Sequence, residues 1–176
     1  ELSQGGMGTV AVLVDEALQR RVAVKTLLGE VATKPLVVSA FIREAQITSQ
    51  LDHPNIVPVH EIGLDDEGQI YFTMKLVEGR NLYEHIRESH KEERKLDYEE
   101  LLNDLEIFIK VCDALAFAHS KGVLHCDVKA LNIMVGSYGQ VYLMDWGVSY
   151  VMGEGTDREG QVRNLLPSMP RSPARG

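Results

Sequence analysis

The stretch HCDVKALN at residues 125–132 decides the fold. It places an acid at Asp127, a cation at Lys129 and an amide at Asn132 within one loop-sized segment. Short apolar segments at 123–124 and 133–135 flank it, and such segments predict strands. Polar groups held in a loop between rigid elements commonly form catalytic or binding sites. This loop is therefore the candidate catalytic segment.

A long helix is predicted directly before this loop. Asp97 followed by Glu100 is typical of a capping box at a helix start, and Gly122 is typical of a helix end. A shorter amphipathic helix is predicted over 81–90. The apolar spacing of the long helix predicts a buried stripe made of Leu101, Leu105, Phe108, Ile109, Cys112, Leu115 and Ala116.

The sequence after the loop predicts a hairpin followed by an acidic turn. The apolar segments 133–135 and 141–144 are joined by the turn-rich residues 136–139. Asp145-Trp146-Gly147 follows the second of these strands. From residue 153 onward the composition shifts to Gly, Glu, Arg, Ser and Pro, so we expect 153–176 to be a mobile tail.

The first half of the chain predicts a sheet and one helix. Alternating or continuous apolar residues predict strands over 9–14, 21–27, 56–62 and 69–77. Between the second and third of them, helical spacing begins near Pro35, which suits a helix start. His53-Pro54-Asn55 should end that helix, because the residue before a proline disfavours the α conformation.

Composition limits the classes of partner. The formal net charge of −8 argues against binding to nucleic acid or to an anionic membrane. The two cysteines, Cys112 and Cys126, are too far apart to suggest a metal knuckle or a disulfide framework. With only these two cysteines, a reducing cytoplasm is the expected location, and no apolar run is long enough for a membrane span. The start at Glu1 suggests a piece of a longer protein, which could carry a membrane anchor elsewhere.

Taken in order, these segments resemble the signature of the eukaryotic-type serine/threonine protein kinases. The signature comprises a Gly-rich turn, a strand Lys, a helix Glu, a His-x-Asp loop and an Asp-x-Gly turn. The resemblance covers the chain from Glu1 to about Val151. It implies an α+β bilobal kinase-like fold with a nearly complete N-lobe, in which four visible strands and a clipped first strand accompany one helix, and a partial helical C-lobe. The implied division is 1–79 for the N-lobe and hinge and 80–152 for the partial C-lobe.

The resemblance implies four catalytic residues. Asp127 would orient and deprotonate the substrate hydroxyl, and Lys129 would neutralise charge on the transferring phosphoryl group. Lys25, in the strand motif Val22-Ala23-Val24-Lys25, would bind the α- and β-phosphates and be held by Glu44. The alternative is an exposed strand Lys and a solvated helix Glu, but a Lys ending an apolar strand is costly to bury unpaired. His125 is expected to be structural.

The resemblance also implies a set of nucleotide and metal contacts. The Gly-rich turn SQGGMGTV at 3–10 would let backbone N–H groups approach the phosphates closely, although a plain hairpin turn is the alternative. Met74 would be the gatekeeper, and the Lys75 carbonyl and Val77 N–H would bond the adenine edge. The residues implied to contact ATP are Ser3, Gly5, Gly6, Gly8, Val10, Ala23, Lys25, Met74, Lys75, Val77 and Met134. Asn132 and Asp145 would bind Mg²⁺. The apolar members of this set are equally compatible with plain core packing.

Several positions depart from the family pattern. Ser3 replaces the first glycine, Trp146 replaces the Phe of the Asp-Phe-Gly turn, and Cys126 stands where most relatives carry an Arg that reads an activation-loop phosphate. Thr48 is smaller and more polar than the usual residue, so we expect looser packing behind the Glu44 helix. Residues 165–176 do not match the Ala-Pro-Glu segment that ends the family's activation segment.

The predicted function is magnesium-dependent transfer of the ATP γ-phosphoryl group to Ser or Thr hydroxyls of a protein substrate. A nucleotide-binding pseudokinase or scaffold is a second hypothesis, favoured by Ser3 and Cys126. A small-molecule phosphotransferase of the aminoglycoside-kinase type is a third, although Lys129, the Val22–Lys25 motif and His53-Pro54-Asn55 argue against it. Neither the substrate nor the oligomeric state can be predicted from the sequence.

Overall fold

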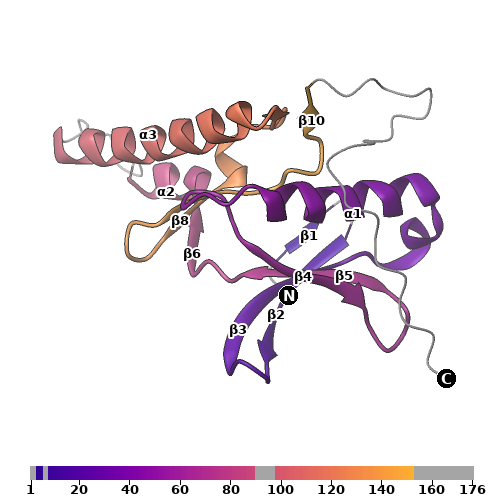
Figure 1. Cartoon of the computed structure of the whole chain (residues 1–176). Coiled ribbons are helices and arrows are strands. Elements are labelled where there is room, and N and C mark those ends of the chain that lie inside the picture. Colours follow the sequence, from indigo (N-terminus) through magenta and orange to yellow (C-terminus); the bar gives the residue numbers. More distant parts are fainter. Residues whose placement is uncertain (1–2, 6–7, 90–97, 153–176) are drawn as a thin grey trace.

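The computed structural model of the chain describes residues 3–5, 8–89 and 98–152 (Figure 1). Three predictions fall outside these residues: Gly6 as a nucleotide contact, Asp97 as a helix cap, and the mobile tail over 153–176. Among the described residues, no helix is long and apolar enough to cross a membrane.

The first half of the chain forms a five-stranded antiparallel sheet with the order β1-β2-β3-β5-β4. Its strands are β1 (Ser3–Gly5), β2 (Gly8–Asp15), β3 (Arg20–Thr26), β4 (Val59–Leu64) and β5 (Ile70–Lys75). β1 is short and pairs with β2, with Ser3 opposite Val10. The four predicted strands and the clipped first strand are thus all present.

One helix, α1 (Pro35–Gln50), packs against one face of this sheet (Figure 1). A single-turn helix, η1 (Gly29–Thr33), leads into α1, and Pro35 occupies the first turn of α1 as predicted. Phe41 and Ala45 of α1 pack with Ala23, Phe72 and Met74 of the sheet. The alternation of side chains along a strand therefore directs Val22, Val24 and Thr73 to the opposite face.

The second half is built from two helices and short strands. α2 spans Leu82–Ser89 and α3 spans Tyr98–Ser120. β6 (Gly79–Asn81), β8 (Ile133–Gly136) and β9 (Val141–Leu143) form a three-stranded sheet. β7 (Val123–Leu124) pairs with β10 (Tyr150–Val151), and the single-turn helix η2 (Ala130–Asn132) closes the candidate catalytic loop. Gly122 ends α3 with a φ of 77°, as its glycine predicted.

The buried stripe of α3 differs from the predicted one. Ile107, Val111, Ala114 and Ala118 are buried, at a spacing of one helical face. Leu101, Leu105, Phe108, Ile109 and Cys112 are exposed, and so is Ala116, while Leu115 is only partly buried. The prediction was wrong because apolar residues occur around most of this helix, so spacing alone could not choose the face that meets the core.

Two apolar clusters form the core. One joins α1 to the five-stranded sheet, around Leu27, Phe41 and Phe72. The other joins α3 to the C-terminal strands and includes Trp146 and Leu143. Ile47 and Leu51 of α1 belong to this second cluster, so α1 contributes to both. The division at residue 79 stays a prediction.

Gly79 connects the two halves where no side chain fits. A Cβ on Gly79 would overlap the Val135 carbonyl oxygen and lie 2.8 Å from Gly136 Cα, both in the backbone of β8. We expect Gly79→Ala to lower the free energy of unfolding by about 1–3 kcal/mol, because backbone cannot move aside as a side chain can. Gly63→Ala is the matched control, since the nearest atoms to its methyl would belong to the Tyr71 side chain, with the hydroxyl oxygen at 3.0 Å. Urea titration measures both, and equal losses would contradict the explanation.

Candidate active site

An ion pair links the sheet to α1. Lys25 Nζ on β3 donates to Glu44 Oε1 on α1 at 2.5 Å. The Lys25 side chain is 18% exposed and that of Glu44 is 9% exposed, so the pair is largely shielded from water. The predicted ion pair is therefore present, and the alternative of two solvated side chains is wrong. Thr48 is buried one turn further on, where its hydroxyl donates to the Glu44 carbonyl at 2.7 Å.

Glu44 stands in an environment that opposes its charge. Burial raises the pKa of the Glu44 carboxyl, the Lys25 ammonium opposes this rise, and the Asp145 carboxylate adds to it. The Lys25 cation is thus what keeps a carboxylate tolerable at this position. An anion brought to Lys25 by a ligand would have to share that cation with Glu44.

Gly147 brings Glu44 and Asp145 to one point. A Cβ on Gly147 would lie 3.1 Å from Glu44 Oε2 and 3.3 Å from Asp145 Oδ1. The absence of a side chain there lets carboxylates from α1 and from the turn after β9 approach each other. Asp145 adopts a φ of 62°, a left-handed conformation that non-glycine residues seldom adopt. Strain of this kind tends to persist at functional sites.

The candidate catalytic loop holds its polar groups together. Lys129 Nζ donates to Asp127 Oδ2 at 2.5 Å, and Asn132 Nδ2 donates to the same oxygen at 3.1 Å and to the Asp127 carbonyl at 2.9 Å. The hydrogen bond from Lys129 is the main cause that lowers the pKa of Asp127, and the same contact raises the pKa of Lys129. The Asp127 carboxyl is consequently ionised and acts as a hydrogen-bond acceptor within the loop.

His125 supports this loop from beneath, as predicted. It is 1% exposed, and its Nε2 lies 2.9 Å from the Met144 carbonyl. Its ring packs on that of Trp146, with centroids 4.6 Å apart. Burial is the main cause that lowers the pKa of His125, which favours the neutral ring. Trp146 is 1% exposed in the second apolar cluster, so the larger ring is accommodated in place of Phe.

Backbone hydrogen bonds fix the loop to the acidic turn. The Met144 N–H donates to the Asn132 carbonyl at 2.8 Å, which ties the end of the catalytic loop to the residue before Asp145. The Leu143 N–H donates to the Asn55 carbonyl at 2.8 Å, and Asn55 Nδ2 donates to the Val141 carbonyl at 2.9 Å. Asn55 was predicted only as part of a helix end, and its role in joining α1's exit to β9 was missed.

The predicted nucleotide-contacting residues are brought together in part. Val10, Ala23 and Met74 share one apolar cluster with Leu76. Met134 lies on β8, opposite Tyr142, and is not part of that cluster. Lys75 lies at the end of β5, and its ammonium contacts the Tyr142 hydroxyl and lies 4.7 Å from the centre of that ring. Val77 follows in the connection to β6 and is partly buried.

The Gly-rich turn is only partly described. Ser3 and Gly5 belong to β1, and Gly6 lies outside the described residues. Gly8 opens β2, where an added Cβ would overlap the Thr26 carbonyl oxygen and lie 3.2 Å from its carbon. The absence of a side chain at Gly8 therefore serves the close approach of β2 to β3. An approach to phosphates stays a prediction.

The donor set suits a magnesium-bound phosphate. Asp145 and Asn132 offer the oxygen ligands that Mg²⁺ prefers, and Mg²⁺ is commonly held by one or two carboxylates together with substrate phosphates. Among the described residues, no group of three His, Cys, Asp or Glu side chains could hold a metal by itself. Gly147 lies close to the carboxylates of Glu44 and Asp145, and Lys25 is bound to the first of them.

Comparison with known proteins agrees with this arrangement. The model of the protein kinase domain family matches residues 1–165. The chain belongs to the protein kinase family. Its predicted fold is thereby confirmed as a kinase-like bilobal fold of which this chain holds part.

Curated relatives carry the name serine/threonine-protein kinase PknD. The kinase chain is 38% identical to the protein from Protochlamydia amoebophila over 176 residues, covering 97% of this chain and 17% of that protein. It is 41% identical to the protein from Chlamydia muridarum over 153 residues, which cover 84% of this chain and 16% of that protein. The protein from Chlamydia pneumoniae is 33% identical to it over 160 residues, which cover 89% of this chain and 17% of that protein. The kinase chain therefore spans less than a fifth of the length of these relatives.

Proposed function

We propose that this kinase chain is the ATP-binding and catalytic core of a serine/threonine protein kinase, acting on protein Ser or Thr hydroxyls with Mg²⁺. The observation that carries the proposal is the Lys25–Glu44 ion pair, whose carboxylate approaches Asp145 across Gly147. The Asn132–Met144 backbone bond joins Asp145's turn to the loop of Asp127. These contacts link β3, α1, the turn of Asp145 and the loop of Asp127, and this linkage supports the proposal.

Binding of ATP would rest on the N-terminal sheet. Lys25 would hold the α- and β-phosphates while Glu44 fixes its direction, and backbone N–H groups of residues 3–8 would cover the phosphates. Val10, Ala23 and Met134 would enclose the adenine, and the backbone of Lys75 and Val77 would bond its edge next to Met74. Asn132 and Asp145 would hold Mg²⁺, which when bound neutralises charge on the phosphate oxygens.

Transfer would rest on the catalytic loop. Asp127 would accept a hydrogen bond from the substrate hydroxyl and so aim its oxygen at the γ-phosphorus. As the new O–P bond forms, the bond to the β-phosphate oxygen breaks and the hydroxyl proton passes to Asp127. Because Lys129 lowers the pKa of Asp127, the carboxylate stays ionised before transfer and would receive that proton late. Lys129 would stabilise negative charge on the γ-phosphoryl group.

The substrate class is tested by transfer from radiolabelled ATP. We expect the full-length protein, with Mg²⁺, to label Ser- and Thr-containing peptides of a mixed library and to leave peptides whose only hydroxyl is Tyr unlabelled. Removal of Mg²⁺ with EDTA should abolish the labelling. Labelling of aminoglycosides in place of peptides would instead establish a small-molecule phosphotransferase.

A pseudokinase is the second candidate, and Cys126 favours it. This residue takes the place of the usual Arg and adopts a φ of 64°, next to Asp127. A pseudokinase would show a thermal shift with ATP and Mg²⁺ but no labelling of any peptide. The two measurements together therefore separate the candidates.

A further inference from the structure

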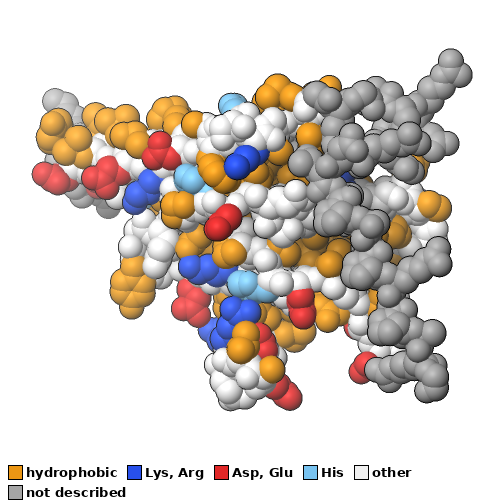
Figure 2. Space-filling view, viewed as in Figure 1, with side chains coloured by type: hydrophobic (Ala, Val, Ile, Leu, Met, Phe, Trp, Pro, Cys, Tyr) orange, Lys and Arg blue, Asp and Glu red, His pale blue; other side chains and the backbone are white. Residues whose placement is uncertain are grey.

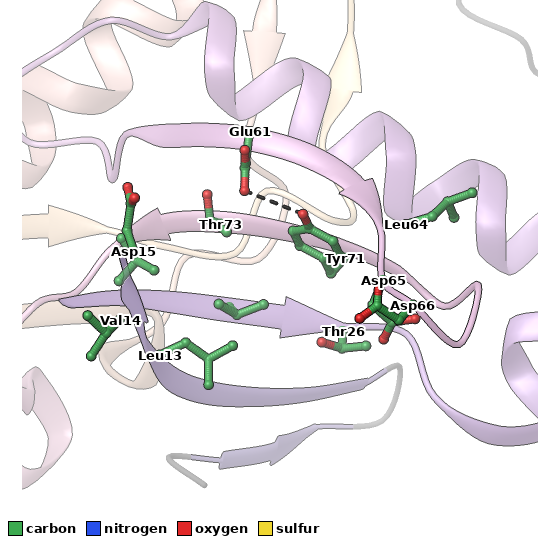
Figure 3. Close-up of a pocket in the computed structure, with 12 residues that line it drawn as sticks. Leu13, Val14, Asp15, Thr26, Glu61, Leu64, Asp65, Asp66, Tyr71 and Thr73 are labelled. Carbon is green, nitrogen blue, oxygen red and sulfur yellow. Dashed lines mark hydrogen bonds between the residues drawn. The ribbon is translucent and has the colours of Figure 1, made fainter. Parts of the chain in front are cut away.

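The face of the five-stranded sheet that is turned away from α1 carries a groove of about 410 Å³ (Figure 3). This outer-sheet groove crosses β2, β3, β5 and β4, and α1 lies behind the sheet in that view. The residues that line it are Leu13, Val14, Asp15, Val22, Val24, Thr26, Glu61, Leu64, Asp65, Asp66, Tyr71 and Thr73. None of them belongs to the candidate active site.

The floor of the groove is aliphatic and its apolar rim is exposed. Val22 and Val24, from β3, are 4% and 6% exposed. At the rim, Leu13, Val14 and Leu64 are 53%, 61% and 68% exposed. Exposed apolar side chains gathered around a hollow are typical of a surface that a partner covers.

Carboxylates stand at both ends of this apolar strip. Figure 3 shows Asp15 at one end, Asp65 and Asp66 at the other, and Glu61 along one side. Arg20 already pairs with Asp15 at 3.2 Å. Among the described residues no Lys or Arg forms an ion pair with Glu61, Asp65 or Asp66, so their negative charges are not neutralised within the protein. Glu61 Oε1 accepts a hydrogen bond from the Tyr71 hydroxyl at 3.4 Å, and Asp65 Oδ1 accepts from the Glu67 and Gln69 N–H groups at 3.0 and 2.7 Å, which leaves the second oxygen of each carboxylate for a cationic partner.

The groove continues past the acidic end. A second hollow of about 440 Å³ shares Thr26, Asp65 and Asp66 with it and adds Glu67 and Gln69. Gln69 Oε1 is buried there without a hydrogen-bond partner among the described residues. The carboxylates of Asp65, Asp66 and Glu67 line this end, so an occupant that brings hydrogen-bond donors would find acceptors there.

Two kinds of occupant fit less well. A second copy of this chain would bring an equally acidic groove face to face with the first, and the chain carries a net charge of −8. A nucleic acid or an anionic lipid surface would be repelled by the same carboxylates. A cationic and aliphatic polypeptide segment complements the floor, the rim and both ends.

We propose that the outer-sheet groove is a docking site for a partner-protein segment of basic–aliphatic–basic pattern. The aliphatic side chains of the segment lie over Val22 and Val24 beside Leu64. Its Lys or Arg side chains reach Glu61 on one side and Asp65 and Asp66 at the end. The site is separate from the candidate active site, so it would recruit a partner independently of bound nucleotide.

The probe for this proposal is a fluorescently labelled peptide of sequence Arg-Lys-Leu-Val-Leu-Arg-Lys, titrated with the full-length protein and followed by anisotropy. We expect saturable binding that weakens as salt is raised, and no binding of the charge-reversed peptide Glu-Glu-Leu-Val-Leu-Glu-Glu. The paired substitutions Glu61→Gln and Asp66→Asn should weaken binding at least about fivefold. Leu64→Ser, which keeps the charges, should weaken it by about threefold or more.

Matched controls remove the same charges and the same side chain elsewhere. Glu99→Gln with Asp113→Asn on α3 gives the protein the same net charge as Glu61→Gln with Asp66→Asn in the groove. Leu101→Ser on α3 is the control for Leu64→Ser, because it also replaces an exposed Leu by Ser. Both controls should bind the peptide within about twofold of the unaltered protein. Equal weakening by control and groove variants, absence of saturable binding, or binding of both peptides alike would overturn the proposal. Concentration-dependent dimerisation lost with Leu64→Ser would assign the groove to a second copy instead.

Discussion

Replacing Asp127 by Asn should reduce phosphoryl transfer by about 100-fold to 10,000-fold while leaving ATP binding nearly unchanged. Asn keeps the size and one acceptor oxygen but cannot take the hydroxyl proton. Asp127 is partly exposed and held by Lys129 and Asn132, so it is not needed for the core. Single-turnover transfer from radiolabelled ATP measures the loss, and isothermal titration with ATP and Mg²⁺ measures the binding.

The matched control for Asp127 is Asp113→Asn, which removes an exposed carboxylate from α3. It should leave the rate of transfer unchanged. Transfer by Asp127→Asn at the unaltered rate would remove Asp127 from the mechanism, whereas loss of ATP binding together with transfer would make its role structural.

The segments that carry short-range signals were predictable from the sequence. The hairpin of β8 and β9 forms around the turn-rich residues 136–139, and Pro35 and Gly122 stand at the helix ends where their backbone preferences put them. The need of Lys25 for a partner was also predictable, because a cation ending an apolar strand is costly to bury unpaired, whereas the choice of Glu44 as that partner came from the resemblance to the kinase family. These inferences depend on residues close in sequence or on one strong energetic demand.

The remainder depended on three-dimensional packing that spacing does not encode. α3 has apolar residues on most of its circumference, and only the neighbouring strands decide that Ile107 and Val111 face inward while Phe108 and Ile109 do not. Similarly, position 8 needs a glycine because the Thr26 carbonyl oxygen occupies the place of a Cβ. Asn55 matters because its side chain donates to the Val141 carbonyl in β9. Each involves a long-range contact of ordinary residue types.

Because another face of α3 meets the core, many of its apolar side chains are exposed. Figure 2 shows them gathered along α3 near its N-terminal end. Leu101, Leu105 and Phe108 are 41%, 47% and 63% exposed. These three residues share one face of α3, while the buried Ile107 and Val111 lie on another, so two apolar stripes compete and the sequence alone could not select the one that meets the core.

Replacing Lys25 by Met should reduce transfer by about 100-fold to 1,000-fold, because the phosphates lose the cation that positions them. Met keeps the aliphatic length and the packing near Phe72, whose ring centre lies 5.7 Å from Nζ. The change also leaves the Glu44 carboxyl buried without its cation. With Lys25 gone, burial and Asp145 both raise the pKa of Glu44, so the folded protein holds that proton more tightly than the unfolded chain does.

The sign of the pH effect follows from that raised pKa. As the pH falls towards the ordinary pKa of a glutamic acid, the Lys25→Met variant should gain stability relative to the unaltered protein, because the folded protein takes up this proton at a higher pH than the unfolded chain does and protonation relieves the buried charge. Adding Glu44→Gln to Lys25→Met should remove this pH dependence of stability without restoring transfer. Glu44→Gln should also lower the rate of transfer much less in the Lys25→Met variant than it does in the unaltered protein. Thermal melting across the pH range and single-turnover assays measure both. Additive losses in transfer would show that Lys25 and Glu44 act separately, and so contradict the proposal that the carboxylate works by holding the cation against the phosphates.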